Sequence, residues 1–160
     1  MPSRDEKWMA LAIETAHAGA LAGEVPIGAV IVDRSGAVVA RAPNRGRTTG
    51  DRTAHAEMVA LREAFAAGAS APGEWTLVTT LEPCVMCLGA AIEIGVGAIV
   101  YALEAPANGG GARVSDARRP PMRGGVARGE VRAMMHAWLA SGPEGRGVEF
   151  VRSLLDATAS

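Results

Sequence analysis

The sequence predicts one α/β domain in which helices cover both faces of a sheet. At 160 residues the chain is long enough to bury one continuous core. Apolar residues make up 49% of it. Helical and strand-like patterns alternate along the chain, with no internal repeat, low-complexity tract or interdomain linker. These observations indicate a single domain that covers residues 1–160.

The elements are predicted from the spacing of apolar residues and from the residues that interrupt it. In order, they are a helix over 5–21, strands over 25–32 and 37–42, a helix over 53–67, a strand over 75–81, a helix over 83–94, a strand over 97–101, and helices over 128–140 and 148–156. The first helix ends before Gly23, and the turn signal at 33–36 separates the two strands of a hairpin. A polar loop over 42–52 follows the hairpin, and Gly68 ends the second helix.

In the second half of the chain, proline and glycine residues mark the ends of most predicted elements. The strand over 75–81 is apolar and rich in threonine. Pro83 is expected in the first turn of the next helix, where its missing N–H costs nothing, and Gly95 ends that helix. The segment Leu103–Gly125 is rich in Pro, Gly and Arg, and its structure does not follow from composition. The breaker Ser141-Gly142-Pro143 separates the last two helices.

Composition narrows the classes of protein to which the chain can belong. The formal net charge is −1, so the overall basic excess typical of polyanion-binding proteins is missing. Aromatic residues, at 4%, are too few for a base-stacking platform. Two cysteines three residues apart cannot form a disulfide framework. Neither a signal core nor a membrane span is recognised, and we expect a cytoplasmic protein without a membrane partner.

Two short fragments contain the residues that predict chemistry. Cys84 and Cys87 lie three residues apart at a predicted helix start, where both sulfurs can face one metal ion and the helix dipole favours thiolate. His55, near the start of another helix, adds an imidazole nitrogen. A structural zinc site has four protein ligands, whereas a catalytic one has three and keeps a place for water. We therefore predict a catalytic Zn²⁺ site at His55, Cys84 and Cys87.

Glu57 is the predicted catalytic residue. It follows His55 by two positions, so its carboxylate can lie beside the water without binding the metal. From there it can accept a proton and deliver it to a ring nitrogen and then to a leaving amine. His-x-Glu followed by Pro-Cys-x-x-Cys is typical of zinc deaminases that act on nucleobases.

The same residues admit other interpretations. The Cys-x-x-Cys pair could be a redox pair, although that function needs no His-x-Glu. A closed structural zinc site would need His17 or His136 as its fourth ligand, and each is expected to be a surface or partly buried histidine. Glu82 could be a plain solvated carboxylate, and it is assigned no catalytic role. Asn44, in a loop, could serve turn geometry or hydrogen-bond a sugar or base.

The chain resembles the cytidine and deoxycytidylate deaminase superfamily, and within it the bacterial tRNA adenosine deaminases. The resemblance lies in Glu24–Val30, Thr53–Glu57 and Thr80–Cys87 and covers about the first hundred residues. It implies a three-layer α/β/α fold with a mixed five-stranded sheet and a homodimer. It also implies that Asn44 and the Ala56 backbone N–H contact the substrate. The catalytic core would then occupy about 5–102, and a divergent loop with C-terminal helices about 103–157.

The resemblance weakens where tRNA enzymes contact RNA. Those enzymes typically continue with Gly-Ala-Arg-Asp, whereas this chain has Glu104 at the Arg position and Ala105 at the Asp position. Arg52 stands where the family commonly has Pro. Those enzymes also usually end the corresponding helix with paired Phe and a basic last turn. The stretch 138–143 of this chain has neither. The remaining positive charge gathers at Arg113, Arg118, Arg119 and Arg123. That cluster could be a solvated loop, hold nucleic acid, or cap a partner subunit's site.

From the sequence we expect a zinc-dependent hydrolytic deaminase that releases ammonia from a free base or nucleoside. The alternative is a tRNA-specific adenosine deaminase that converts adenosine to inosine. A second alternative is a non-catalytic zinc-binding module, although such a module would have no use for Glu57.

Overall fold

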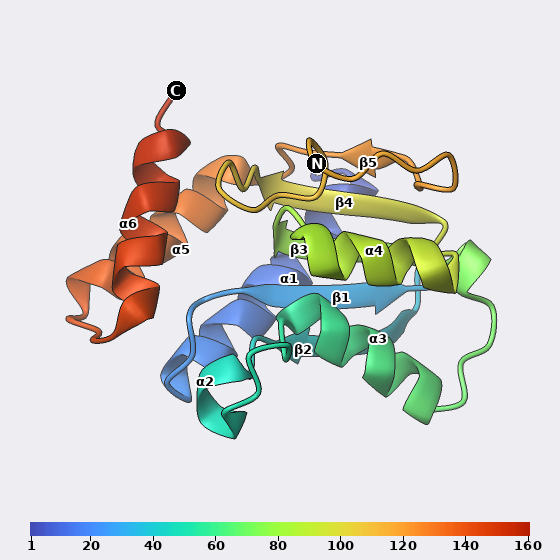
Figure 1. Ribbon diagram of the computed structural model, residues 1–160, viewed down its shortest axis with the longest axis horizontal. Coiled ribbons are helices and arrows are strands. Elements are labelled where there is room, and N and C mark those ends of the chain that lie inside the picture. Colours follow the sequence, from blue (N-terminus) through green and yellow to red (C-terminus); the bar gives the residue numbers. More distant parts are fainter.

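The computed structural model describes all 160 residues and has a five-stranded sheet between helices (Figure 1). The helices are α1 (Arg4–Leu21), α2 (Gly46–Thr49), α3 (Ala56–Ala66), α4 (Val85–Ile94), α5 (Arg128–Ala140) and α6 (Arg146–Ala157). The strands are β1 (Gly28–Val32), β2 (Val38–Pro43), β3 (Thr76–Leu81), β4 (Ala98–Leu103) and β5 (Met122–Arg123). A 3₁₀ turn covers Pro72–Glu74. No helix is both long and apolar enough to cross a membrane.

The sheet is mixed, as the resemblance implied, with strand order β2-β1-β3-β4-β5. β1 is antiparallel to both β2 and β3, whereas β3, β4 and β5 run parallel. Parallel neighbours need a crossover connection, and α4 supplies it between β3 and β4. The carboxyl ends of β3 and β4 therefore lie at the same edge of the sheet.

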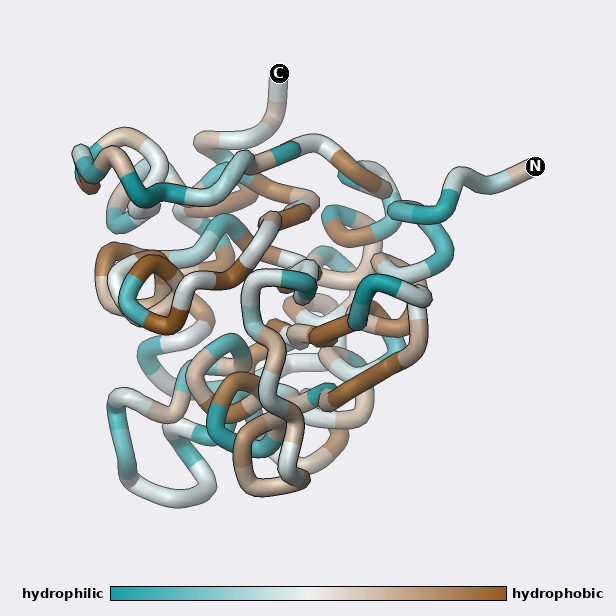
Figure 2. Tube along the Cα trace, turned by 90° about the vertical axis from the view of Figure 1, so that its right-hand side faces the viewer, coloured by the Kyte–Doolittle hydropathy of each residue, from teal (hydrophilic) through white to brown (hydrophobic).

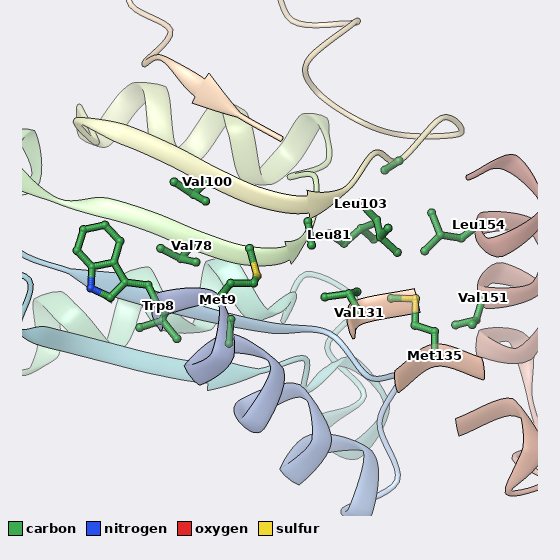
Figure 3. Packing of buried hydrophobic residues seen from close by; sticks show 14 of the residues in the cluster. Trp8, Met9, Val78, Leu81, Val100, Leu103, Val131, Met135, Val151 and Leu154 are labelled. Carbon is green, nitrogen blue, oxygen red and sulfur yellow. The ribbon is translucent and has the colours of Figure 1, made fainter. Parts of the chain in front are cut away.

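Side chains alternate between two apolar layers, because successive residues of a strand point to opposite faces. Val30, Val78 and Val100 belong to the cluster that includes residues of α1, α5 and α6, part of which Figure 3 shows. Ile31 and Leu77 belong to a second cluster with residues of α3 and α4. Many of the hydrophilic segments lie in turns at the outside of the molecule (Figure 2). The three-layer α/β/α prediction is confirmed.

α1 begins with a capping box. The Ser3 side chain accepts a hydrogen bond from the Glu6 N–H, and the Glu6 carboxylate accepts one from the Ser3 N–H.

The close packing of α1 on the sheet depends on small residues. Gly28 faces the helix so closely that a Cβ there would lie 2.3 Å from the Ala12 carbonyl oxygen. This contact explains the glycine at the start of β1.

The predicted ends of several helices and strands were wrong by a few residues. β1 begins at Gly28 and not at Val25, because Val25-Pro26-Ile27 forms a turn in which the Ile27 N–H donates to the Val25 carbonyl at 2.8 Å. α3 begins at Ala56, three residues later than expected. Pro83 precedes the N-cap of α4 and so lies outside its first turn. The elements α2 and β5 were not predicted at all.

The arginines of the segment 103–125 mainly hold that segment together. Arg113 donates to the carbonyls of Pro106 (2.6 Å) and Gly109 (3.0 Å), and Arg119 donates to that of Gly111 (2.6 Å). Ion pairs join Arg118 to Asp116 and Glu93, and Arg123 to Asp5. This arrangement favours a structural role for the cluster over a role in holding nucleic acid.

Two arginines of α5 fix the far end of α6. Arg128 forms an ion pair with Glu104 and donates to the carbonyl of Thr158 at 2.7 Å. Arg132 donates to the carbonyl of Leu155 at 3.0 Å and to the Thr158 hydroxyl at 2.6 Å. Carbonyls at a helix end lack intrahelical donors, and these guanidinium groups satisfy them. As a result α6 is held at the end of the sheet where α3 and α4 begin (Figure 1).

Candidate active site

The three predicted metal ligands meet between the starts of two helices. His55 is the N-cap residue of α3, Cys84 is the N-cap residue of α4, and Cys87 lies in the first turn of α4. His55 Nδ1 is 3.5 Å from each of the two Sγ atoms, and the sulfurs are 3.6 Å apart. The fold thus brings together residues that are 32 positions apart in the chain.

These separations fit a tetrahedral zinc ion. Bonds of about 2.3 Å to sulfur and about 2.0–2.1 Å to nitrogen place neighbouring ligand atoms roughly 3.5–3.8 Å apart. No fourth His, Cys, Asp or Glu belongs to the ligand cluster. His17 and His136 are both exposed, as expected, and neither belongs to that cluster. The closed structural site is therefore not formed, and the donor set is that of an open zinc site.

The two thiols share their proton unequally. The hydrogen bond between the sulfurs lowers the pKa of Cys84 to about 4, with His55 adding to the effect. The same hydrogen bond, together with burial, raises the pKa of Cys87. Two thiolates 3.6 Å apart repel each other unless a cation lies between them. The hydrogen bond between the sulfurs therefore favours thiolate at Cys84 only, and a bound zinc ion would stabilise thiolate at both cysteines.

Glu57 is buried beside this cluster, in the first turn of α3, with 4% of its surface exposed. Its Oε1 accepts from the Thr79 hydroxyl at 3.2 Å, and its Oε2 accepts from the Cys87 thiol at 3.4 Å. Burial raises the pKa of this carboxyl above its ordinary value. The carboxylate thus lies next to the ligands without belonging to their cluster.

A cavity of about 350 Å³, here called the inner cavity, opens at these residues. Its lining includes every predicted site residue except Cys87, namely Asn44, His55, Ala56, Glu57 and Cys84. The volume is that of a pocket for a small molecule or for one unit of a larger one. As the first residue of α3, Ala56 has an N–H without an intrahelical acceptor.

Glu24 orients Asn44 and was not predicted. It is 2% exposed, and its carboxylate accepts from Asn44 Nδ2 at 3.2 Å and from the backbone N–H groups of Arg47 (3.3 Å) and Thr48 (2.7 Å). These bonds fix the Asn44 amide and begin the short helix α2. A signal was available, because Glu24 opens one of the sequence blocks on which the resemblance depends.

The prediction that Glu82 is a solvated carboxylate was wrong. It is 9% exposed, lines the inner cavity and accepts from the Gly111 N–H at 3.1 Å. The inner cavity is also lined by Asn108 from the segment 103–125, and by Arg146 and Phe150 from α6. No motif marks these last three residues, because only the fold brings them to the site.

The family is established by residues 2–103, which match the cytidine and deoxycytidylate deaminase zinc-binding region. The match covers most of the chain, so the protein belongs to this family of zinc deaminases. Its members hydrolyse carbon–nitrogen bonds, and the donor set described above is their zinc site. The predicted enzyme class and cofactor are confirmed.

Two relatives are named for their action on tRNA. The tRNA(Ile)-lysidine synthase of Deinococcus radiodurans is 45% identical over 135 residues, which are 79% of this chain and 23% of that protein. The tRNA-specific adenosine deaminase of Bacillus subtilis is 41% identical over 112 residues, or 67% of this chain and 66% of that protein. The chain thus spans about a quarter of the first relative and about two thirds of the second.

Solved structures of two kinds have the same fold. A structure from a study of A-to-I editing by tRNA:A34 deaminases superposes with a TM-score of 0.72 and 35% identity, over 80% of this chain and 98% of that one. The guanine deaminase of Nitrosomonas europaea superposes with a TM-score of 0.76 and 28% identity, over 88% of this chain and 86% of that one.

Proposed function

We propose that this protein deaminates adenosine in tRNA to inosine. The proposal reverses the preference for a free base drawn from the sequence, and it is supported by relatives that are named tRNA-specific adenosine deaminases. The structure related to A-to-I editing also shares more identical residues with this chain than the guanine deaminase of Nitrosomonas europaea does.

The shape of the site is the observation that carries the proposal. The inner cavity continues into a second hollow of about 590 Å³, here called the outer groove, between residues 44–52 and 144–147. Val25, Asn44, Arg52, His55, Arg146 and Gly147 line both. A free base needs only the inner cavity, whereas a base attached to a polynucleotide needs an exit for its sugar and phosphates. The outer groove is suited to that exit.

The residues of the inner cavity have the groups that this reaction requires. A zinc ion held by His55, Cys84 and Cys87 would supply a Lewis acid that activates water. Glu57 would transfer one proton of the attacking water to the ring nitrogen and the other to the departing amine, which leaves as ammonia. The six-membered ring gains an oxo group and loses ammonia. The Asn44 amide and the Ala56 N–H would hold the ring in place.

Deamination of a free purine base is the second candidate. The superposition with guanine deaminase covers 88% of this chain and 86% of that one, and it favours this candidate. Phe150 of α6, which lines the inner cavity, would also give a free base an apolar contact.

Ammonia release from three substrates distinguishes the candidates. A tRNA anticodon stem-loop with adenosine at the wobble position, free adenosine and guanine would be incubated with zinc-loaded protein. We expect the stem-loop to have the highest kcat/KM. Rapid turnover of guanine with no activity on the stem-loop would contradict the proposal and support the second candidate. The homodimer and the cytoplasmic location expected from the sequence stay predictions.

A further inference from the structure

Two arginines stand at the passage from the inner cavity to the outer groove. Arg52 lies in the turn between α2 and α3, and Arg146 is the first residue of α6. Both side chains are exposed, and both residues line the inner cavity and the outer groove. Residues 94 positions apart in sequence thus add positive charge to one entrance.

These two arginines differ from most others in the chain because no protein group binds them. Of the fifteen arginines, seven form ion pairs, four donate only to carbonyl or hydroxyl oxygens, and Arg4 lies over the Trp8 ring. Only the side chains of Arg52, Arg62 and Arg146 have no hydrogen bond, ion pair or aromatic contact. Arg62 is exposed on α3 and lines neither hollow.

The acidic groups nearby are mostly engaged in other contacts. Glu24 accepts three hydrogen bonds, Glu57 accepts from Thr79 and Cys87, and Glu82 accepts from Gly111. Glu144 lines the outer groove but not the inner cavity, and it is exposed. Arg47 also lines that groove and donates to the Glu144 carbonyl oxygen at 3.0 Å. An anion at the entrance would therefore meet two free guanidinium groups.

We propose that Arg52 and Arg146 bind phosphate attached to the sugar of the base that is deaminated. The inference rests on the proposed function, because it takes the base to lie in the inner cavity beside Glu57. The sugar then extends toward the outer groove, and the next group outward is a phosphate. The planar guanidinium group matches two oxygens of a phosphate and keeps its charge at every physiological pH.

Both arginines lie outside the sequence blocks on which the family resemblance depends. Arg52 directly precedes the block Thr53–Glu57, at a position where the resemblance implies proline. Arg146 belongs to α6, which lies outside the family match over 2–103. Glu104, which replaces an arginine, forms an ion pair with Arg128 and does not line the inner cavity. The entrance thus has positive charge although position 104, which lines neither hollow, supplies none.

The experiment compares phosphorylated and unphosphorylated substrates in matched variants. Arg52→Gln and Arg146→Gln remove the proposed contacts, and Arg62→Gln is the control because it removes an equally free charge outside both hollows. Zinc content and circular dichroism are measured first, to establish that all three variants fold. The substrates are adenosine, adenosine 5′-monophosphate and an RNA hairpin with a loop adenosine.

Each of the two test variants should raise KM for the phosphorylated substrates about tenfold, with kcat little changed, as expected for the loss of one charge-assisted contact. Adenosine itself should be used as well as before. On the hairpin, log(kcat/KM) should become less dependent on log[salt], by roughly 0.7 for each lost phosphate contact. Arg62→Gln should leave all these values unchanged.

Three results would overturn the inference: an equal loss on adenosine, an equal loss in Arg62→Gln, or no loss on any substrate. If unaltered protein does not deaminate the hairpin, the proposed function has failed, but the comparison of nucleoside with nucleotide still tests the arginines. Calorimetric binding of the same ligands to zinc-loaded protein makes that comparison without turnover. A preference for the mononucleotide over the hairpin would identify a small nucleotide as the source of the phosphate.

Discussion

At the scale of single residues, the reactive groups are held by neighbours that do not react. Thr79 donates to Glu57, and Glu24 fixes the amide of Asn44. These supports explain how a carboxylate with 4% of its surface exposed can be kept in one orientation. The chemistry of the site is therefore sensitive to residues on both sides of the inner cavity.

Glu57→Gln should abolish deamination while leaving zinc bound. The amide has nearly the same shape as the carboxylate, but it cannot transfer a proton. We expect kcat to fall by about 10²–10⁴-fold, the range for general acid–base catalysis. Turnover and zinc content are measured on the same preparation, and Glu63→Gln, a partly exposed position on the same helix, is the control. Full activity in Glu57→Gln would exclude the proton-transfer role.

Glu24→Gln should weaken both the fold and substrate binding. The neutral side chain loses charge-assisted hydrogen bonds to Asn44 and to two backbone N–H groups, at a cost of about 1.5–3 kcal/mol. We expect a lower free energy of unfolding in urea and a higher KM. Glu14→Gln is the control, since its exposed ion pair with Arg41 contributes little. An unchanged KM would show that Asn44 is held without Glu24.

At the scale of elements, close contacts between backbones decide where glycine is required. A Cβ at Gly28 would lie 2.3 Å from the Ala12 oxygen and 2.6 Å from the Ala16 nitrogen, both backbone atoms of α1. Backbone cannot move aside as a flexible side chain can. The contact between α1 and β1 therefore depends on the missing side chain.

Gly28→Ala should destabilise the protein by about 1–3 kcal/mol, because the helix must shift away from the sheet. Gly89→Ala is the matched control, since a Cβ there would meet nothing within 4 Å in the middle of α4. That substitution should stabilise the protein by about 0.5–1 kcal/mol. Urea unfolding of both variants measures the two effects, and equal shifts in the same direction would contradict the argument.

The long elements and the metal ligands could be predicted, because their signals are local. Apolar spacing indicates α1, and the short intervals from His55 to Glu57 and from Cys84 to Cys87 define the site. The four-residue helix α2 depends on a carboxylate more than twenty positions earlier, at Glu24. The two-residue strand β5 exists only beside β4. Neither has a pattern of its own long enough to detect.

At the scale of the whole molecule, the zinc site joins two helices on one face of the sheet. Its ligands come from the starts of α3 and α4, which follow different strands. An ion that binds only when these starts meet adds its binding free energy to the stability of the fold.

Removal of zinc by a chelator should lower the Tm. Zinc at a thousandfold excess over its Kd stabilises the folded state by about 4 kcal/mol, which corresponds to roughly 10 °C for a domain of this size. Scanning calorimetry before and after chelation, and after zinc is added back, measures the change. Cys84→Ser should respond much less to the chelator. A Tm that does not change in the unaltered protein would contradict the zinc assignment.

The reacting groups of the inner cavity and part of its lining come from separate stretches of the chain. All the metal ligands and Glu57 lie within residues 55–87, whereas Arg146 and Phe150 belong to α6. Mutations in α6 can therefore change which molecules enter while the reacting groups stay the same. Over evolutionary time, a lineage with this architecture can acquire a new substrate by altering one terminal helix. Selectivity can then diverge quickly while reactivity remains under strict selection.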